Sequence, residues 1–153
     1  MFRYDFQGKP QGVHAGVAGR VGAAAIALAC VALLVTAAWL RPDERGHGTH
    51  TQLGLPPCGF ENATGLPCLT CGMTTAFSLA ADGRLVSALR VQPMGALLAV
   101  SVAVLLLLCG YAAASGLNLR PLASALTQAP VLITLAGVLI AAWAYKMMLA
   151  MAG

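Results

Sequence analysis

Two long uncharged apolar runs, residues 21–40 and 94–115, constrain the fold of this chain more than any other feature. A third run, 129–149, carries one charged residue, Lys146, close to its end and beside the aromatic residues Trp143 and Tyr145. An α-helix needs about 20 apolar residues to cross the hydrocarbon core of a bilayer. Each run has that length, so the sequence predicts three transmembrane helices at these positions.

The overall composition agrees with a membrane location. Hydrophobic residues make up 59% of the 153 residues and charged residues only 9%, whereas soluble domains are about a quarter charged. The expected partner of this surface is therefore the lipid bilayer. The net charge of +4 is spread along the chain without a basic run, which gives no support to nucleic-acid binding.

The segments outside the three runs define the domain organisation. Residues 1–20 are polar and glycine-rich, and we expect them to form a disordered tail ahead of a single membrane domain, 21–153. Between the first two spans, residues 52–92 alternate short apolar and polar stretches typical of amphipathic helices. The predicted fold is an all-α integral membrane protein of three transmembrane helices, with a cysteine-bearing helical insert between helices 1 and 2.

The insert contains three of the five cysteines: Cys58, Cys68 and Cys71. Proline suits the first position of a helix, so Pro67 predicts a helix start just before the Cys68-x-x-Cys71 pair. On such a helix, one face is polar or reactive, made of Cys68, Cys71, Thr75, Ser78 and Asp82. The other two cysteines, Cys30 and Cys109, lie within apolar runs, where a thiol behaves as a small hydrophobic group.

The same segment resembles a known family. Residues 57–77 read P-C-G-F-x-x-x-T-G-L-P-C-x-T-C-G-M-T-T-A-F, and Gly83, Ala88 and Gln92-Pro93-x-Gly95 follow. This pattern resembles the DUF2752 family of small bacterial membrane proteins over roughly a third of the chain. The chain departs from many members at two positions, with Leu69 in place of proline and Thr75 in place of arginine. The motif positions outside the cysteines are occupied here by Gly65, Pro67, Gly72, Thr74, Thr75, Phe77 and Pro93.

The resemblance also implies a location and an orientation. It implies a multi-pass protein of the bacterial cytoplasmic membrane, with a cytoplasmic N-terminus and the cysteine loop on the outside. Basic residues do not decide the orientation, because they are divided almost evenly between the two sides of the predicted topology. The resemblance brings no established activity.

Three hypotheses compete for the cysteines. The first is structural: a disulfide among Cys58, Cys68 and Cys71 fixes the insert, as in oxidising compartments. The second is a metal site, in which His47 and His50 join Cys68 and Cys71, or Cys58 replaces either histidine, to give a tetrahedral zinc site.

The third hypothesis is thiol–disulfide exchange, with Cys68 attacking and Cys71 resolving. The function that the sequence favours is a membrane accessory or interaction protein, without enzymatic activity, whose insert is held by a disulfide or a metal ion. Its expected partners are another membrane protein or a second copy of the chain. The alternative is a thiol-redox or metal-dependent membrane enzyme that uses Cys68 and Cys71.

Overall fold

The computed structural model describes residues 14–152, and every regular element in that range is a helix. The elements in order are α1 (Val17–Trp39), the 3-10 helix η1 (Thr49–Leu53), α2 (Gly59–Thr64), α3 (Met73–Ala81), α4 (Leu85–Val91), α5 (Pro93–Ser115), α6 (Arg120–Leu126) and α7 (Ala129–Ala152). The described chain contains one isolated β-bridge, between His14 and Leu117, and no strand. The all-α prediction is confirmed for this range.

Two helices, α1 and α5, are each long and apolar enough to cross a membrane. Each has 23 residues, which at 1.5 Å per residue gives roughly 35 Å, more than the ~30 Å hydrocarbon core. Among the described residues, α6 and the part of α7 up to Tyr145, bent by 56° relative to one another, give a third candidate span if they count as one crossing. Pro130 lies in the first turn of α7, just after this break, where its missing N–H costs no bond within the helix.

The first span begins at Val17, earlier than the predicted residue 21. Arg20, predicted to lie in the disordered tail, is therefore helical; residues 1–13 of that tail lie outside the described residues. The Arg20 side chain donates hydrogen bonds to the carbonyl oxygens of Ala113 (2.9 Å) and Ala114 (3.1 Å) at the end of α5. A cation satisfying terminal carbonyls is favourable there, which explains how the helix accommodates a charge.

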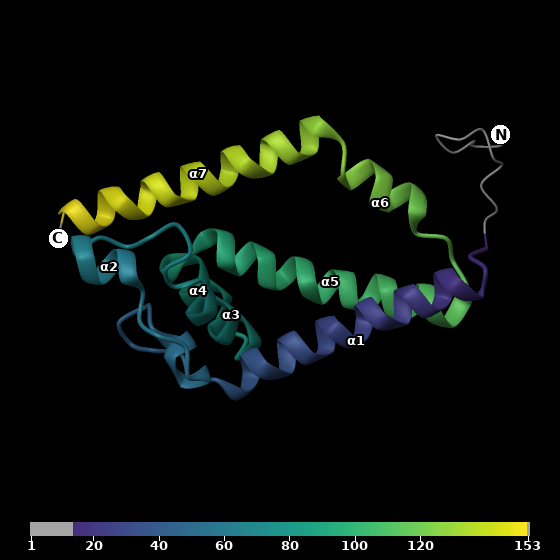
Figure 1. The fold of residues 1–153 in the computed structure, drawn as a ribbon, viewed down its shortest axis with the longest axis horizontal. Coiled ribbons are helices and arrows are strands. Elements are labelled where there is room, and N and C mark those ends of the chain that lie inside the picture. The colour runs from purple at the N-terminus through teal and green to yellow at the C-terminus, as the bar shows by residue number, and fades with distance from the viewer. Residues whose placement is uncertain (1–13, 153) are drawn as a thin grey trace.

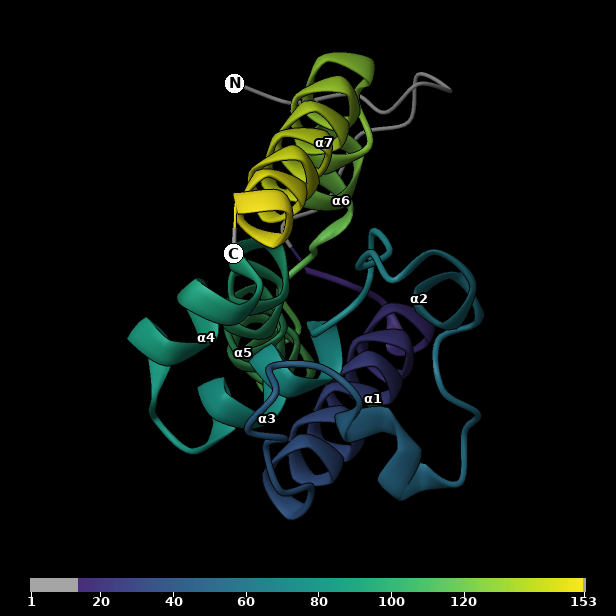
Figure 2. The ribbon, with the colours of Figure 1, turned by 90° about the vertical axis from the view of Figure 1, so that its left-hand side faces the viewer.

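Helices α1 and α5 lie side by side and antiparallel, and the insert folds at the end where α1 stops and α5 starts (Figure 1). Figure 2 shows the short helices of the insert gathered around that end. Helix α7 runs along the other side of α5 and its C-terminal end also lies at the insert end of the molecule (Figure 1). The insert thus covers one end of the α1–α5 pair.

Helix α3 is the part of the insert that packs against both spans. Its Phe77 is buried against Ala37 of α1 and Ala99 of α5. The approach to α5 is close at Gly95, where an added Cβ would lie 2.9 Å from the Cβ of Ala76. The small residues of α5 therefore allow α3 to pack closely against it, as small residues do between membrane helices.

Buried polar contacts fix the orientation of α3. The Ser78 hydroxyl donates to the carbonyl oxygen of Leu40, where α1 ends. The hydroxyls of Thr75 and Thr49 share a hydrogen bond of 2.7 Å, and both residues are buried. Because an unpaired buried hydroxyl is costly, these contacts specify one docking arrangement of the insert.

Candidate metal centre

The three cysteines of the insert converge on one point. The sulfur atoms of Cys58, Cys68 and Cys71 all lie within 4.8 Å of one another, although Cys58 is ten residues from its nearest partner in the chain. Cys58 caps the N-terminus of α2, while Cys68 and Cys71 belong to the turns that precede α3. Cys71 is buried, and the other two are half-buried.

The prediction that a helix starts near Pro67 is wrong. Helix α3 begins at Met73, and Gly72 caps it with a left-handed conformation, φ 83°. This conformation strongly favours glycine, and it turns the chain between the cysteine pair and the helix. Cys68 and Cys71 are therefore held by a turn, in which the Cys71 N–H donates to the Cys68 carbonyl at 3.2 Å, and they do not share a helical face with Thr75.

A second left-handed glycine brings Cys58 back to the pair. Gly65 ends α2 with φ 71°, and its N–H donates to the Glu61 carbonyl at 2.8 Å. The chain then reverses and returns through Pro67 to Cys68. This reversal places the start of α2 beside the turn before α3.

Cys68 and Cys71 are thiols in the structure, with their sulfur atoms 3.2 Å apart, well beyond the ~2.05 Å of a disulfide. Burial raises the pKa of Cys68, but hydrogen bonds from Thr70, Cys71 and Cys58 outweigh this effect and lower the pKa to about 7. Burial, together with the hydrogen bond to Cys68, raises the pKa of Cys71 to about 12. Cys68 is therefore the first thiol of the pair to ionise.

Glu61 is a site residue that the sequence reasoning missed. One of its carboxylate oxygens, Oε2, lies 3.6 Å from the Cys71 sulfur, and the other, Oε1, lies 3.0 Å from Nδ1 of His47. The signal was its position three residues after Cys58: on a helix capped by Cys58, position 61 lies on the same side as the cap. The carboxylate links the cysteine cluster to the loop that follows α1.

The two histidines lie beside the cluster without joining it. His47 contacts Glu61, and Nε2 of His50 lies 3.2 Å from the carbonyl oxygen of Pro56. Among the described residues, neither ring belongs to the group of ligand atoms within 4.8 Å of one another. The structure thus brings together the three-sulfur set rather than the two-histidine, two-cysteine set.

A cavity of about 350 Å³ adjoins the cluster. Its lining includes all three cysteines, both histidines, Glu61 and the threonines Thr70, Thr74 and Thr75. Thiolate, imidazole and carboxylate are the groups that bind zinc in proteins. The donor set around this cavity therefore suits a zinc ion, with the sulfurs as the closest group.

The other residues of the sequence motif have structural positions. Phe77 is a buried residue of α3. Pro93 occupies the first turn of α5, the place where proline is tolerated best. The residue before it, Gln92, is buried, and its Nε2 donates to the Leu69 carbonyl at 3.0 Å. Gln92 thereby ties the cysteine turn to the start of a span.

Cys30 and Cys109 are buried within α1 and α5, outside the cluster.

Comparison with known proteins gives one match. Residues 58–106 match the family model described as "Protein of unknown function (DUF2752)". The matched segment runs from Cys58 through the cluster, α3 and α4 into the middle of α5. No curated protein and no solved structure matched the chain.

Proposed function

Because the chain is a member of the DUF2752 family through residues 58–106, we propose a function for the cysteine cluster, which lies wholly within that region. The cluster is a structural zinc site in a membrane accessory protein. The ion binds Cys58, Cys68 and Cys71 and holds the insert in one conformation on the ends of α1 and α5. The protein has no catalytic role in this proposal: the rigid insert is the surface that another membrane protein or a second copy of the chain recognises.

The number and spacing of the sulfurs support a metal over a disulfide. A disulfide joins two of the three thiols and leaves the third beside it, whereas a metal ion uses all three. In a tetrahedral zinc site with Zn–S distances of ~2.3 Å, neighbouring sulfurs lie roughly 3.8 Å apart. The observed spread of up to 4.8 Å accommodates that arrangement with small movements.

The observation that carries the proposal is the lack of a core beneath α2. This helix has no buried residue, so packing does not hold it against the rest of the insert. Its links to the other elements are polar and lie at the cluster: Cys58 at its cap, and Glu61 beside Cys71 and His47. Small elements that lack a hydrophobic core are commonly stabilised by a structural metal.

Glu61 is our candidate for the fourth ligand. Its carboxylate is already beside Cys71, and His47 contacts the oxygen that does not face the sulfur. Ligating carboxylates usually have such a second partner, which orients them. His47 then acts as the positioning residue of that ligand.

Elemental analysis of the purified protein, combined with thiol counting, tests this function. We expect about one zinc per chain, with Cys58, Cys68 and Cys71 protected from alkylation until a chelator removes the ion. Two unreactive cysteines that a reductant releases, without metal, would instead support the disulfide. A mixture of dithiol and disulfide that changes with growth conditions would support redox function.

The split in thiol acidity favours a second candidate function, thiol–disulfide exchange. A pKa of about 7 for Cys68 and about 12 for Cys71 resembles an attacking and a resolving thiol. In metal-free protein we expect the rate of Cys68 alkylation to rise with pH and to reach half its plateau near pH 7, since the thiolate is the reactive form. Cys71 should react slowly throughout this range. Mass spectrometry of peptides from a pH series measures both rates, and equal rates at pH 7 would contradict this assignment.

We also propose the topology of the whole chain. The bent pair α6–α7 forms the third crossing, the N-terminus is cytoplasmic, and the cysteine loop lies outside the cytoplasmic membrane of a bacterium. The antiparallel α1 and α5, with the insert joining their adjacent ends, support placing the insert on a single side. A membrane-impermeant maleimide should label a cysteine introduced in the 41–51 loop of intact cells, and labelling only after lysis would reverse the orientation.

A further inference from the structure

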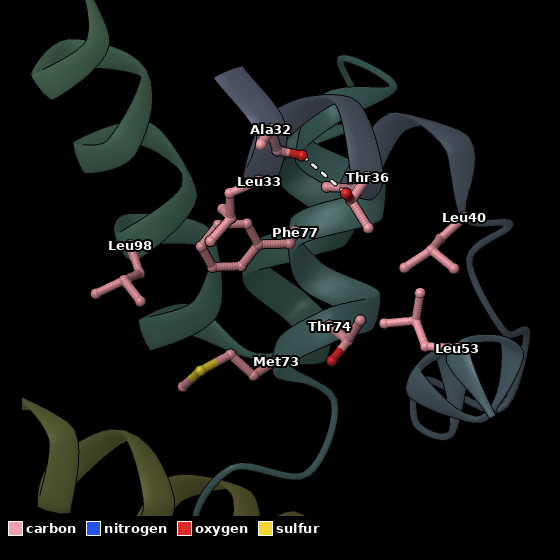
Figure 3. A pocket seen from close by; sticks show the side chains of 10 residues that line it. Ala32, Leu33, Thr36, Leu40, Leu53, Met73, Thr74, Phe77 and Leu98 are labelled. Carbon is pink, nitrogen blue, oxygen red and sulfur yellow. Dashed lines mark hydrogen bonds between the residues drawn. The ribbon is translucent and has the colours of Figure 1, made fainter. Parts of the chain in front are cut away.

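A second cavity lies between α1, η1, α3 and α5, on the other side of the start of α3 from the cysteine cavity. It is an open groove of about 500 Å³. Figure 3 shows its ten lining side chains, with Phe77 and Leu33 near the centre and Leu40 and Leu53 facing one another at one end. Met73 and Thr74 line both cavities, so the wall between them is a single helical turn.

The groove surface is apolar. Only two of its ten lining residues, Thr36 and Thr74, have polar side chains. The Thr36 hydroxyl donates to the Ala32 carbonyl at 2.8 Å within α1 (Figure 3), so it needs no partner from a ligand. A groove with so few polar groups offers water little hydrogen bonding and favours a hydrocarbon occupant.

The groove follows the last part of a predicted membrane span. Its lining runs from Ala32 of α1 to Leu40, the C-cap of that helix, which corresponds to roughly 12 Å along the helix axis. Trp39, the aromatic residue expected at the membrane interface, is next to Leu40 and is 75% exposed. The groove therefore extends from the interface into the hydrocarbon layer.

A basic residue follows the groove-lining residue Leu40 in the chain. Arg41 follows Leu40 directly, and its backbone is held by both groups of the Gln52 side chain: Gln52 Nε2 donates to the Arg41 carbonyl, and the Arg41 N–H donates to Gln52 Oε1 at 3.1 Å. Arg41 is exposed, and its guanidinium has no acidic partner within 4.0 Å among residues 14–152. The chain thus places a cation without an acidic partner directly after Leu40, two residues from Trp39.

We propose that this groove binds one phospholipid, with an acyl chain lying along α1 from Leu40 toward Ala32 and the phosphate against Arg41. The apolar lining matches the acyl chain, and the cation of Arg41, next to Leu40 in the chain, matches the phosphate, for which a guanidinium is a strong donor. The bound lipid fills the space between α1 and α3 and so contributes to the docking of the insert. The inference concerns a different cavity from the zinc site and does not depend on it.

Native mass spectrometry of the protein, purified in detergent and supplied with 1-palmitoyl-2-oleoyl-phosphatidylglycerol, tests the proposal. Wild-type protein should retain one lipid per chain. Ala32→Phe, which places a ring in the groove from an exposed position, should reduce retention roughly tenfold or more, because the ring displaces several buried methylenes. Ala25→Phe, two turns away on an exposed part of α1 outside this groove, is the matched control and should retain lipid as wild type does.

Arg41→Gln distinguishes a phospholipid from an apolar molecule of another kind. Its retention of phosphatidylglycerol should fall several-fold, while retention of dioleoylglycerol, which has no phosphate, should not change. Equal retention by wild type and Ala32→Phe, or an equal loss in Ala25→Phe, would overturn the groove as the binding site. Equal retention of phosphatidylglycerol by wild type and Arg41→Gln would overturn the role of the phosphate.

Discussion

Serine in place of Cys58, Cys68 or Cys71 is expected to abolish zinc retention and to lower the amount of protein in membranes several-fold. Each variant removes one of three sulfur ligands from the cluster. The loss of affinity should exceed the 10–100-fold typical of losing a partner of a ligand. Because α2 has no buried residue to hold it, the insert loses its main constraint, and even ~1–2 kcal/mol changes cellular abundance several-fold. Quantitative immunoblots and elemental analysis measure the two effects.

The matched controls are the cysteines within the spans. Cys30→Ala and Cys109→Ala each remove a buried thiol outside the cluster, so zinc content should stay at the wild-type level even if stability falls a little. Normal abundance of all three serine variants, combined with loss of a cellular activity, would contradict the structural role and support a catalytic one.

Gly95→Val is expected to separate α3 from α5 and to cost about 1–3 kcal/mol or more, the range of overpacked cores. A Cβ at Gly95 would lie 2.9 Å from the Ala76 Cβ and 3.2 Å from the Met73 Cα. Neither atom is the end of a flexible side chain, so the helices themselves must move. Thermal unfolding of the detergent-solubilised variant should begin at a clearly lower temperature than that of the wild type.

Gly110 provides the matched control on the same helix. A Cβ at Gly110 would meet nothing within 4 Å, so Gly110→Ala should be neutral or slightly stabilising, because alanine favours the helix over glycine. Equal unfolding temperatures of Gly95→Ala and Gly110→Ala would contradict the close packing of α3 against α5 at Gly95.

The sequence predicted the long helices well because length and apolar composition determine them almost alone. Pro93 starts α5 within one residue of the predicted position, and Gly116 caps its end. The start of α1 was harder to predict, because a charged Arg20 ordinarily argues against a membrane helix. Only its contacts with the α5 carbonyls, which join residues more than 90 positions apart, explain its place.

The cysteine turn was mispredicted because a tertiary contact overrides a local preference. Pro67 and the spacing of the cysteines favour a helix, but Gly72 in the left-handed conformation ends the turn, and buried Gln92 holds the Leu69 carbonyl from a distant part of the chain. Similarly, no sequence spacing shows that Glu61 lies between Cys71 and His47. The cysteines were recognisable as a group, and the spacing from Cys58 was a signal for Glu61, but its contacts with Cys71 and His47 required the fold.

X-ray absorption spectroscopy at the zinc edge of the purified, detergent-solubilised protein tests the central claim most directly. The account predicts a bound ion with three sulfur neighbours at about 2.3 Å and one oxygen or nitrogen neighbour at about 2.0 Å. Glu61→Ala should leave the sulfur shell intact, while Cys68→Ser should remove it together with the bound ion. Protein that binds no zinc, or zinc surrounded only by oxygen and nitrogen, would contradict the claim that Cys58, Cys68 and Cys71 form a metal site.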